Sequence, residues 1–562
     1  MVKEDGSRRN CESDDALCAN MSNRTSRGGL SRRAFLAGAC ATGALALAGE
    51  LTACAQEPQP ADQGTADGAG TGGDAAQGGS APANVDKTYD TDLLIVGAGG
   101  SGLACAVQAA LNGTNFILVE KNSQVGGNAS FVEGMFAVGS TLQREQGVEI
   151  DPADIVEAEL TRGQHRQNGA YWLDLVNKSA ENIDWCIEQG VLYSGTVDDY
   201  YGGLFPTFHW FQDGKAEVGY VEPMKARIDE LGVQLHLNTA VKGLLRDGDK
   251  GRITGAYAEG DEGVVRYNAK AVVLATGGFG GNAEVIAEQG WNTDGIHIVG
   301  SPNAAGDGYR MAMDQGARDF MAQSAQSILY AIQALPPIDF HDAAENPING
   351  YFGIAAGGPV LWVNEACERY SRENLTDDNL VLQCIPGKEN KENYVVFDQA
   401  IFDEFFGTDD DARKTFDDAL SSNDGNSLHR ADTIAELADA FQLDADALAA
   451  TVDRYNELAA AGADTDLGKP ADLMVPIETA PFYMAKLTYS YFFSVGGIAT
   501  DKNRRVLDGD RNPIEGLYAI GNDGNMLYRN VYTINMPGTA FGNQVNSGRE
   551  AANAVRDYLQ SA

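Results

Sequence analysis

The sequence predicts an α/β protein that contains a Rossmann-like nucleotide-binding domain, and three neighbouring observations predict it. An apolar run leads into Gly97-Ala-Gly99-Gly-Ser-Gly102, a G-x-G-x-x-G turn that opens an alanine-rich helical stretch. A second apolar run, 116–119, follows this stretch. It ends at Glu120, about 20 residues beyond the turn, where an acid can accept hydrogen bonds from a ribose. Strand, glycine turn, helix, strand and acid in this order are typical of a dinucleotide-binding βαβ unit.

The glycine turn has a physical role in such a unit. The glycines let the backbone turn tightly and approach a pyrophosphate, and the N-terminus of the next helix stabilises that anion by its N–H groups and its dipole. The chain carries one such fingerprint, so the sequence predicts no separate nicotinamide site.

Size and charge limit the classes of partner. The chain has 562 residues, of which 43% are hydrophobic, which is enough for two or more domains with substantial cores. It carries 41 Lys and Arg against 80 Asp and Glu, a formal net charge of -39. This charge repels phosphate backbones and anionic lipid surfaces, so binding of nucleic acid and polybasic docking to membranes are not expected.

The sequence also predicts no metal site. The eight cysteines form no C-x-x-C or C-x-x-C-H motif, and the six histidines show no ligand spacing, so haem, iron–sulfur and zinc sites are not expected. The acidic stretch around 402–460 has apolar residues at helical intervals, which predicts solvated helices rather than calcium loops.

The first 54 residues resemble a bacterial export signal with a lipid-attachment site. Arg32 and Arg33 stand directly before the apolar run 37–49, which is short for a membrane-spanning helix and is typical of the twin-arginine export route. The alternative is an amphipathic helix that begins with basic residues. Leu-Thr-Ala-Cys54 resembles a lipobox. Together they predict an exported protein, lipid-anchored at Cys54 on the outer face of a bacterial cytoplasmic membrane.

Residues 55–88 are rich in Gly, Ala, Pro, Gln and Asp, with almost no large apolar side chain. Such a segment cannot offset the entropy of ordering, so we expect a disordered linker. Translation from Met21 would give a more usual signal than translation from Met1, and both starts stay open. Export by this route moves folded proteins, which suits a large cofactor that is bound non-covalently.

Further glycine-containing motifs follow the first one. They are Gly126-Gly127-Asn128-Ala129-Ser130, Thr276-Gly277-Gly278, Gly306-Asp307-Gly308, Gly521-Asn522 and Pro537-Gly538-Thr539. In this order and spacing they resemble the FAD-dependent fumarate reductase and 3-ketosteroid dehydrogenase superfamily, over residues 90–562. The resemblance implies bound FAD and a discontinuous FAD-binding domain, 89–320 and 490–562, with an α+β capping domain inserted at 321–489.

The resemblance also implies a set of FAD-binding residues. They are Gly97, Gly99, Gly102, Glu120, Lys121, Gly126, Gly127, Asn128, Ala129, Ser130, Thr276, Gly277, Gly278, Asp307, Asn522, Gly538 and Thr539. The chain carries neither the haem motifs of a fused cytochrome nor the S-G-A-[ST] signature of a covalently bound FMN module. We therefore expect electrons from a separate membrane-linked donor, a cytochrome or a quinol-linked flavoprotein.

The substrate's proton donor differs from the family pattern. In fumarate reductases Arg-Phe-x-x-Glu is followed, four residues after the Glu, by the arginine that protonates the substrate, and the ketosteroid enzymes have a tyrosine there. Arg369-Tyr-Ser-Arg372-Glu373 matches the pattern, but Asp377 stands at the fourth position. In a dry pocket Asp377 can have a raised pKa and act as an acid, or it can be a residue of a surface loop; both readings stay open.

Three more positions of the family's dicarboxylate site differ. Ala325, Phe493 and Met536 stand where two histidines and an arginine would hold carboxylates. A small dianion would be left buried and unpaired there, at a cost of roughly several kcal/mol, so fumarate and succinate are poor candidates. Tyr489, Tyr491, Phe492, Phe493 and 526–532 form a largely apolar and aromatic set in their place, which suits a larger, flatter substrate.

These residues predict an FAD-dependent oxidoreductase acting on CH–CH groups. The expected reaction is reduction of an activated C=C bond in a mid-sized, aromatic or cyclic organic acceptor, with Arg529 available to hold one carboxylate. The candidate catalytic residues are Asp377, Tyr532, Tyr491 and Arg372. Two alternatives stay open: a ketosteroid-like dehydrogenase that runs in the oxidative direction, and a flavin electron carrier or binding lipoprotein. Packing of the aromatic residues in a core is the alternative for each of them taken singly.

Overall fold

The computed structural model describes most of the chain beyond the predicted linker. The described residues are 82, 84–200, 203–337, 354–355, 358–373, 384–407, 409–422, 426–530, 532 and 535–561. All of them belong to one compact unit, 74–341 with 347–562. The predicted signal at 1–54, the linker up to residue 81 and Asp377 lie outside the described residues.

A six-stranded sheet forms the centre of the first domain. Its order is β18 (Arg505–Leu507), β19 (Pro513–Ala519), β11 (Ala271–Leu274), β2 (Leu93–Val96), β3 (Phe116–Val119) and β7 (Gln234–His236). All neighbours pair in parallel except β18 with β19. Every residue of β2, β3 and β11 is buried, which explains why these strands are continuous apolar runs in the sequence.

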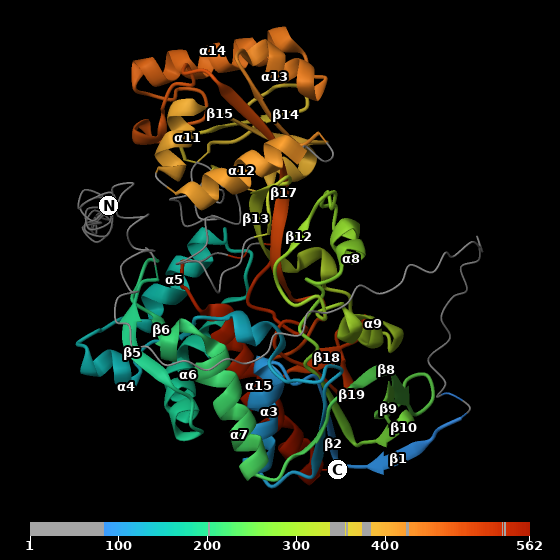
Figure 1. Cartoon of the computed structure of the whole chain (residues 1–562). Coiled ribbons are helices and arrows are strands. Elements are labelled where there is room, and N and C mark those ends of the chain that lie inside the picture. Colours follow the sequence, from blue (N-terminus) through green and yellow to red (C-terminus); the bar gives the residue numbers. More distant parts are fainter. Residues whose placement is uncertain are drawn as a thin grey trace, which may run out of the picture. The chain divides into compact units, whose positions relative to one another are not determined.

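Each face of this sheet is covered by a different layer (Figure 1). On one face lie α3 (Gly100–Leu111), α7 (Glu222–Glu230) and α15 (Thr539–Ser561), and α3 and α15 pack side by side. On the other lies an antiparallel sheet of β8 (Thr239–Arg246), β9 (Ile253–Gly260) and β10 (Gly263–Asn268), joined in parallel by β1 (Lys87–Asp90). Lys87 and Thr88, the last two residues of the predicted linker, pair with β10 and so belong to this sheet.

Smaller elements flank these layers. A three-stranded sheet consists of β4 (Gly134–Phe136), β6 (Phe208–Phe211) and β5 (Tyr193–Asp198). Three helices come between β4 and β5 in the chain: α4 (Thr141–Glu145), α5 (Pro152–Arg162) and α6 (Gly169–Glu188). Two more, α8 (Ala283–Glu288) and α9 (Asp307–Asp314), follow β11. Ile155 of α5, Trp172 of α6 and Met536 before α15 share one hydrophobic cluster.

The inserted region forms an α+β domain around a long strand, β17 (Phe482–Val495). Five strands pair in one sheet with it: β12 (His297–Ile298), β13 (Ala325–Ile332), β14 (Leu361–Asn364), β15 (Asn393–Asp398) and β16 (Leu428–Ala431). β17 runs through the predicted boundary at 489–490. The chain therefore passes from the inserted domain to the FAD-binding domain inside one strand.

Four helices cover the inserted sheet (Figure 1). They are α11 (Gln399–Phe406), α12 (Asp410–Ser422), α13 (Ile434–Phe441) and α14 (Ala445–Ala461), so the prediction of helices around 402–460 is confirmed. Phe402, Phe416, Leu437 and Val452 pack into the core of the domain. Among the helices that the structure describes, none has the length and apolar character needed to cross a membrane.

Candidate functional site

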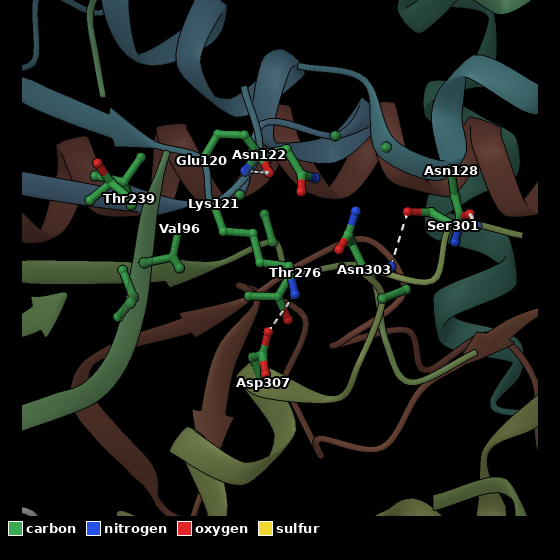
Figure 2. Close-up of a pocket in the computed structure, with 18 of the residues that line it drawn as sticks. Val96, Glu120, Lys121, Asn122, Asn128, Thr239, Thr276, Ser301, Asn303 and Asp307 are labelled. Carbon is green, nitrogen blue, oxygen red and sulfur yellow. Dashed lines mark hydrogen bonds and ion pairs between the residues drawn. The ribbon is translucent and has the colours of Figure 1, made fainter. Parts of the chain in front are cut away.

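A cleft opens at the carboxyl ends of β2, β3 and β11 (Figure 2). In parallel α/β sheets this edge is where ligands bind. The cleft is lined by Val96, Gly97, Gly99, Val119, Glu120, Lys121, Asn122, Gly127, Asn128, Thr239, Val241, Ala275, Thr276, Gly277, Ser301, Asn303, Ala304, Asp307 and Met311. The structure thus brings nine of the predicted FAD-binding residues together in one cavity: Gly97, Gly99, Glu120, Lys121, Gly127, Asn128, Thr276, Gly277 and Asp307.

The glycine turn leaves room for a phosphate. Gly97 has φ 104°, and a Cβ there would lie 2.3 Å from the Ala275 carbonyl oxygen. A Cβ on Gly102 would lie 1.9 Å from the Gly97 carbonyl oxygen, so both positions require glycine. A Cβ on Gly99 would instead point into space, with only the Gly126 carbonyl oxygen at 3.5 Å. Since Gly99 directly precedes α3 and lines the cleft, this space lies at a helix N-terminus, where a pyrophosphate is stabilised.

Glu120 is fixed at the end of β3. The Ala98 N–H donates to its Oε2 at 2.8 Å, and the Asn122 N–H donates to its Oε1 at 3.0 Å. Glu120 is buried but lines the cleft. Because each carboxylate oxygen has a second lone pair, both can still accept hydrogen bonds from the hydroxyls of a ribose.

Lys121 and Asp307 form an ion pair at the cleft, with Nζ 2.7 Å from Oδ2 (Figure 2). Arg310 also contacts Asp307, at 3.2 Å. Desolvation favours the neutral acid, but the Lys121 ammonium and the Arg310 guanidinium outweigh it and hold the pKa of Asp307 below its ordinary value. Lys121 follows β3 and Asp307 begins α9, so the pair links two walls of the cleft.

Asp523 supports the Thr276–Gly278 turn and was not among the predicted residues. Its Oδ2 accepts the Thr276 N–H at 2.5 Å and the Thr276 hydroxyl at 2.9 Å, and its Oδ1 accepts the Gly278 N–H at 2.9 Å. Asp523 is 1% exposed, and burial raises its pKa. The only signal in the sequence is its position next to Asn522.

The remaining predicted FAD-binding residues lie outside the lining of this cleft. They are Gly102, Gly126, Ala129, Ser130, Gly278, Asn522, Gly538 and Thr539. Gly126 to Ser130 form the turn that faces the first glycine motif, since the Gly126 N–H donates to the Ala98 carbonyl oxygen at 2.9 Å. Gly538 and Thr539 lie at the start of α15, where the Phe136 N–H donates to the Gly538 carbonyl oxygen at 3.2 Å. They stay predicted FAD contacts.

Four buried side-chain amide atoms near the C-terminal return have no hydrogen-bond partner among the described residues: Asn522 Oδ1, Asn525 Nδ2, Asn535 Nδ2 and Asn543 Nδ2. A buried polar group without a partner costs about 1–3 kcal/mol, so such groups are rare in folded proteins. A flavin ring offers both donors and acceptors along its polar edge. The residues of this region therefore fit a bound flavin.

An aromatic series lies beside this return. Phe493 contacts Tyr532 with a centroid distance of 5.3 Å, Tyr532 contacts Tyr528 at 5.0 Å, and Tyr528 contacts Trp172 at 5.6 Å, all edge to face. Tyrosine phenols are protonated at neutral pH, and burial raises the pKa of Tyr528 and of Tyr532 further. Tyr491 is completely buried, and its hydroxyl has no partner among the described residues.

The Arg369–Glu373 motif forms a buried ionic cluster in the inserted domain. Arg369 Nη2 lies 2.8 Å from Glu373 Oε2 and 2.8 Å from Asp464 Oδ2, and Lys469 Nζ lies 3.4 Å from Glu373 Oε2. Arg372 is exposed, and Asp377 lies outside the described residues. The catalytic roles of Asp377, Tyr532, Tyr491 and Arg372 therefore stay predictions. Among the described residues, no group of three His, Cys, Asp or Glu side chains is placed to bind a metal ion.

Comparison with known proteins decides the family. A family model described as "FAD binding domain" matches residues 92–534. The chain belongs to this FAD-binding family. The flavoprotein is 29% identical over 488 residues to the vinyl phenol reductase of Lactiplantibacillus plantarum, a match that covers 83% of this chain and 96% of that protein. It is 29% identical over 443 residues to the urocanate reductase of Eggerthella lenta, covering 77% and 70%.

A solved structure shows the same fold. The open conformation of a flavocytochrome c3 fumarate reductase superposes on the flavoprotein with a TM-score of 0.60 at 25% identity, covering 85% of this chain and 79% of that one. The predicted superfamily and fold class, a Rossmann-like FAD-binding domain with an inserted α+β domain, are thus confirmed. The protein binds FAD and is an FAD-dependent oxidoreductase acting on CH–CH groups.

Proposed function

We propose that this flavoprotein reduces a carbon–carbon double bond conjugated to an aromatic or cyclic ring of a small organic acceptor. The observation that carries the proposal is the aromatic series Phe493, Tyr532 and Tyr528, which packs in one hydrophobic cluster with Ala325 and Met536. We refer to these five residues as the aromatic wall. Small-molecule sites are lined mainly by apolar and aromatic side chains, which can stack on or pack against an aromatic ring. Similarity to a vinyl phenol reductase over nearly its whole length supports the same substrate class.

FAD, when bound, supplies hydride to the double bond. The chain then has to hold the ring, exclude water and deliver a proton to the neighbouring carbon. Tyr532 is our candidate for that proton among the described residues, because its ring contacts Phe493 and its phenol, whose pKa burial raises further, carries a proton at neutral pH. Asp377, Tyr491 and Arg372 stay alternatives or partners for this step.

The proposal includes the place where the reaction runs and the source of electrons. The twin-arginine and lipobox pattern at 1–54 favours lipid attachment at Cys54 in the cell envelope, and the single dinucleotide fingerprint favours a separate membrane-linked donor, a cytochrome or a quinol-linked flavoprotein. Cell fractionation with a Cys54→Ala variant tests this part: the wild type should sediment with membranes and the variant should not. Equal distribution of the two would refute lipid anchoring.

An anaerobic dye assay tests the activity. The purified FAD protein is supplied with a reduced low-potential viologen, and dye oxidation is followed with 4-vinylphenol, hydroxycinnamates, urocanate, a steroid enone and fumarate. We expect oxidation by a compound with a ring-conjugated double bond, with its saturated product detected, and little by fumarate. Oxidation by fumarate alone would refute the substrate class. Oxidation by none of them, with a redox-active flavin, would favour a dehydrogenase or an electron carrier.

A further inference from the structure

Helix α5 buries an acid where an amphipathic helix normally buries an apolar residue. The helix begins after the N-cap Asp151, whose side chain accepts the Ala153 N–H, and its buried residues are Ile155 and Glu159. Glu159 is 0% exposed. Arg162 follows three residues later, on the same side of the helix, and is half-buried. Buried carboxylates are rare unless a positive charge or hydrogen bonds stabilise them, and Arg162 supplies a positive charge on the same side of the helix.

Glu159 acts on the side chains around the aromatic series. Burial lowers the pKa of Arg162, and the negative charge of Glu159 opposes this effect. The same charge contributes to the raised pKa of Tyr528 and of Tyr532, after burial itself. The negative charge of Glu159 thus favours the charged guanidinium of Arg162 beside the aromatic wall.

Arg162 reaches the segment that precedes α15. Its Nη1 donates to Asn535 Oδ1 at 3.3 Å. Asn535 is 0% exposed, its carbonyl oxygen accepts the Leu204 N–H at 3.0 Å, and its Nδ2 has no partner among the described residues. Because Oδ1 is turned toward the guanidinium, the unsatisfied N–H groups of the amide are available to a ligand.

Arg162 and Asn535 lie beside two residues of the aromatic wall, Tyr532 and Met536. Asn535 directly precedes Met536, the residue that stands where the family pattern has a carboxylate-binding arginine. Tyr532, three residues earlier, contacts Phe493. A positive charge from α5 thus lies next to the position from which an arginine is missing, and at the edge of the aromatic wall.

We propose that Arg162 and Asn535 bind a hydrogen-bond-accepting oxygen of the substrate, a phenol oxygen or a carboxylate, while Glu159 positions Arg162. The inference rests on the proposed function and adds to it the polar group that the substrate carries besides its double bond. A ring held by Phe493 and Tyr532 can rotate in an apolar wall, so an oxygen bound at one end fixes which carbon faces the flavin.

A binding titration tests this without turnover. The oxidised FAD protein is titrated with 4-ethylphenol, 3-phenylpropanoate and ethylbenzene, and the change in flavin absorbance gives each dissociation constant. We expect Arg162→Gln to weaken the preferred oxygen-bearing ligand by roughly tenfold to a hundredfold, the range for a charge-assisted hydrogen bond, and ethylbenzene by less than about twofold. Arg162→Lys, which keeps the charge but not the planar fork, should give a smaller loss. The matched control is Arg166→Gln at an exposed arginine of the next loop.

The pattern of outcomes separates the possibilities. A loss confined to 4-ethylphenol identifies a phenol oxygen, and a loss confined to 3-phenylpropanoate identifies a carboxylate. Equal losses for all three ligands, no loss for any, or no binding of an oxygen-bearing ligand by the wild type would overturn the inference. The FAD content and Tm of each variant are measured first, and Arg162→Lys replaces Arg162→Gln if the latter lacks FAD.

Turnover distinguishes this inference from the proposed function. If the wild type reduces no ring-conjugated double bond in the dye assay, the proposed function fails. If it does, and the variants keep the wild-type KM for 4-vinylphenol and 4-hydroxycinnamate, only the role of Arg162 fails. The expected result is a raised KM with little change in kcat for oxygen-bearing substrates, since the anchor is made in the ground state as well as the transition state.

Discussion

Replacing Asp523 by asparagine should weaken FAD binding, although the side chain does not line the cleft. The carboxylate accepts two backbone N–H groups, from Thr276 and Gly278, and the Thr276 hydroxyl. Asparagine has one acceptor oxygen, so its amino group must face one of the two N–H donors. One buried N–H then loses its partner, and the Thr276–Gly278 turn, which forms a wall of the cleft, is no longer held.

The magnitude follows from this count. An unsatisfied buried N–H costs about 1–3 kcal/mol. Relief of carboxylate burial offsets part of this cost, because burial raises the pKa of Asp523. If this free-energy cost destabilises only the FAD-bound protein, the FAD dissociation constant rises about fivefold to 150-fold.

Fluorescence quenching of FAD titrated with deflavinated protein measures that constant. Asp314→Asn, at an exposed acid at the end of α9, is the matched control. An Asp523→Asn protein that binds FAD within twofold of the wild type would refute the argument, because the turn would then hold its shape without the carboxylate.

Three further predictions concern the proton donor, the cleft and the buried histidine. Tyr532→Phe should lower kcat in the dye assay by about 100-fold or more while binding of 4-ethylphenol changes little, and an unchanged kcat would remove Tyr532 from the donor role. Lys121→Met should raise the FAD dissociation rate by at most about fivefold, because a partly exposed ion pair contributes about 0–1 kcal/mol; a much larger rise in stopped-flow release would indicate a direct contact with FAD. Burial lowers the pKa of His209 from 6.5 to about 4, so the unfolded chain binds a proton more readily than the folded protein does. The free energy of unfolding should therefore fall by about 3 kcal/mol as the pH falls from 6.5 to 4. Denaturant unfolding of His209→Gln against the wild type checks this, and identical pH slopes would contradict it.

The parts of the cofactor site that are local in the sequence were predictable. Gly97, Gly99 and Glu120 lie within one βαβ unit, so their spacing predicted them together at the cleft, while Lys121 was predicted through the resemblance. Asp307 was found only through the resemblance, since 186 residues separate it from Lys121.

The residues that sequence reasoning missed act through contacts between distant segments. Asp523 supports a turn 247 residues before it, and Arg162 contacts Asn535 at a separation of 373 residues. Neither forms a motif, because the backbone that each one serves comes from another part of the chain. Glu159 in particular reads as an ordinary exposed helix residue until the helix is packed against Tyr528 and Tyr532.

The Arg369–Glu373 match has a structural explanation that limits what it says about catalysis. Glu373 is fully buried, accepts hydrogen bonds from Nε and Nη2 of Arg369, and lies 3.4 Å from Nζ of the buried Lys469. Breaking such a cluster would leave a charge unpaired in the core, at a cost of about 3–5 kcal/mol, so the motif is explained by folding alone. What the cluster does fix is the start of the segment that leads to Asp377. The match of the motif is therefore explained by the structural role of Arg369 and Glu373, and it does not identify which side chain delivers the proton.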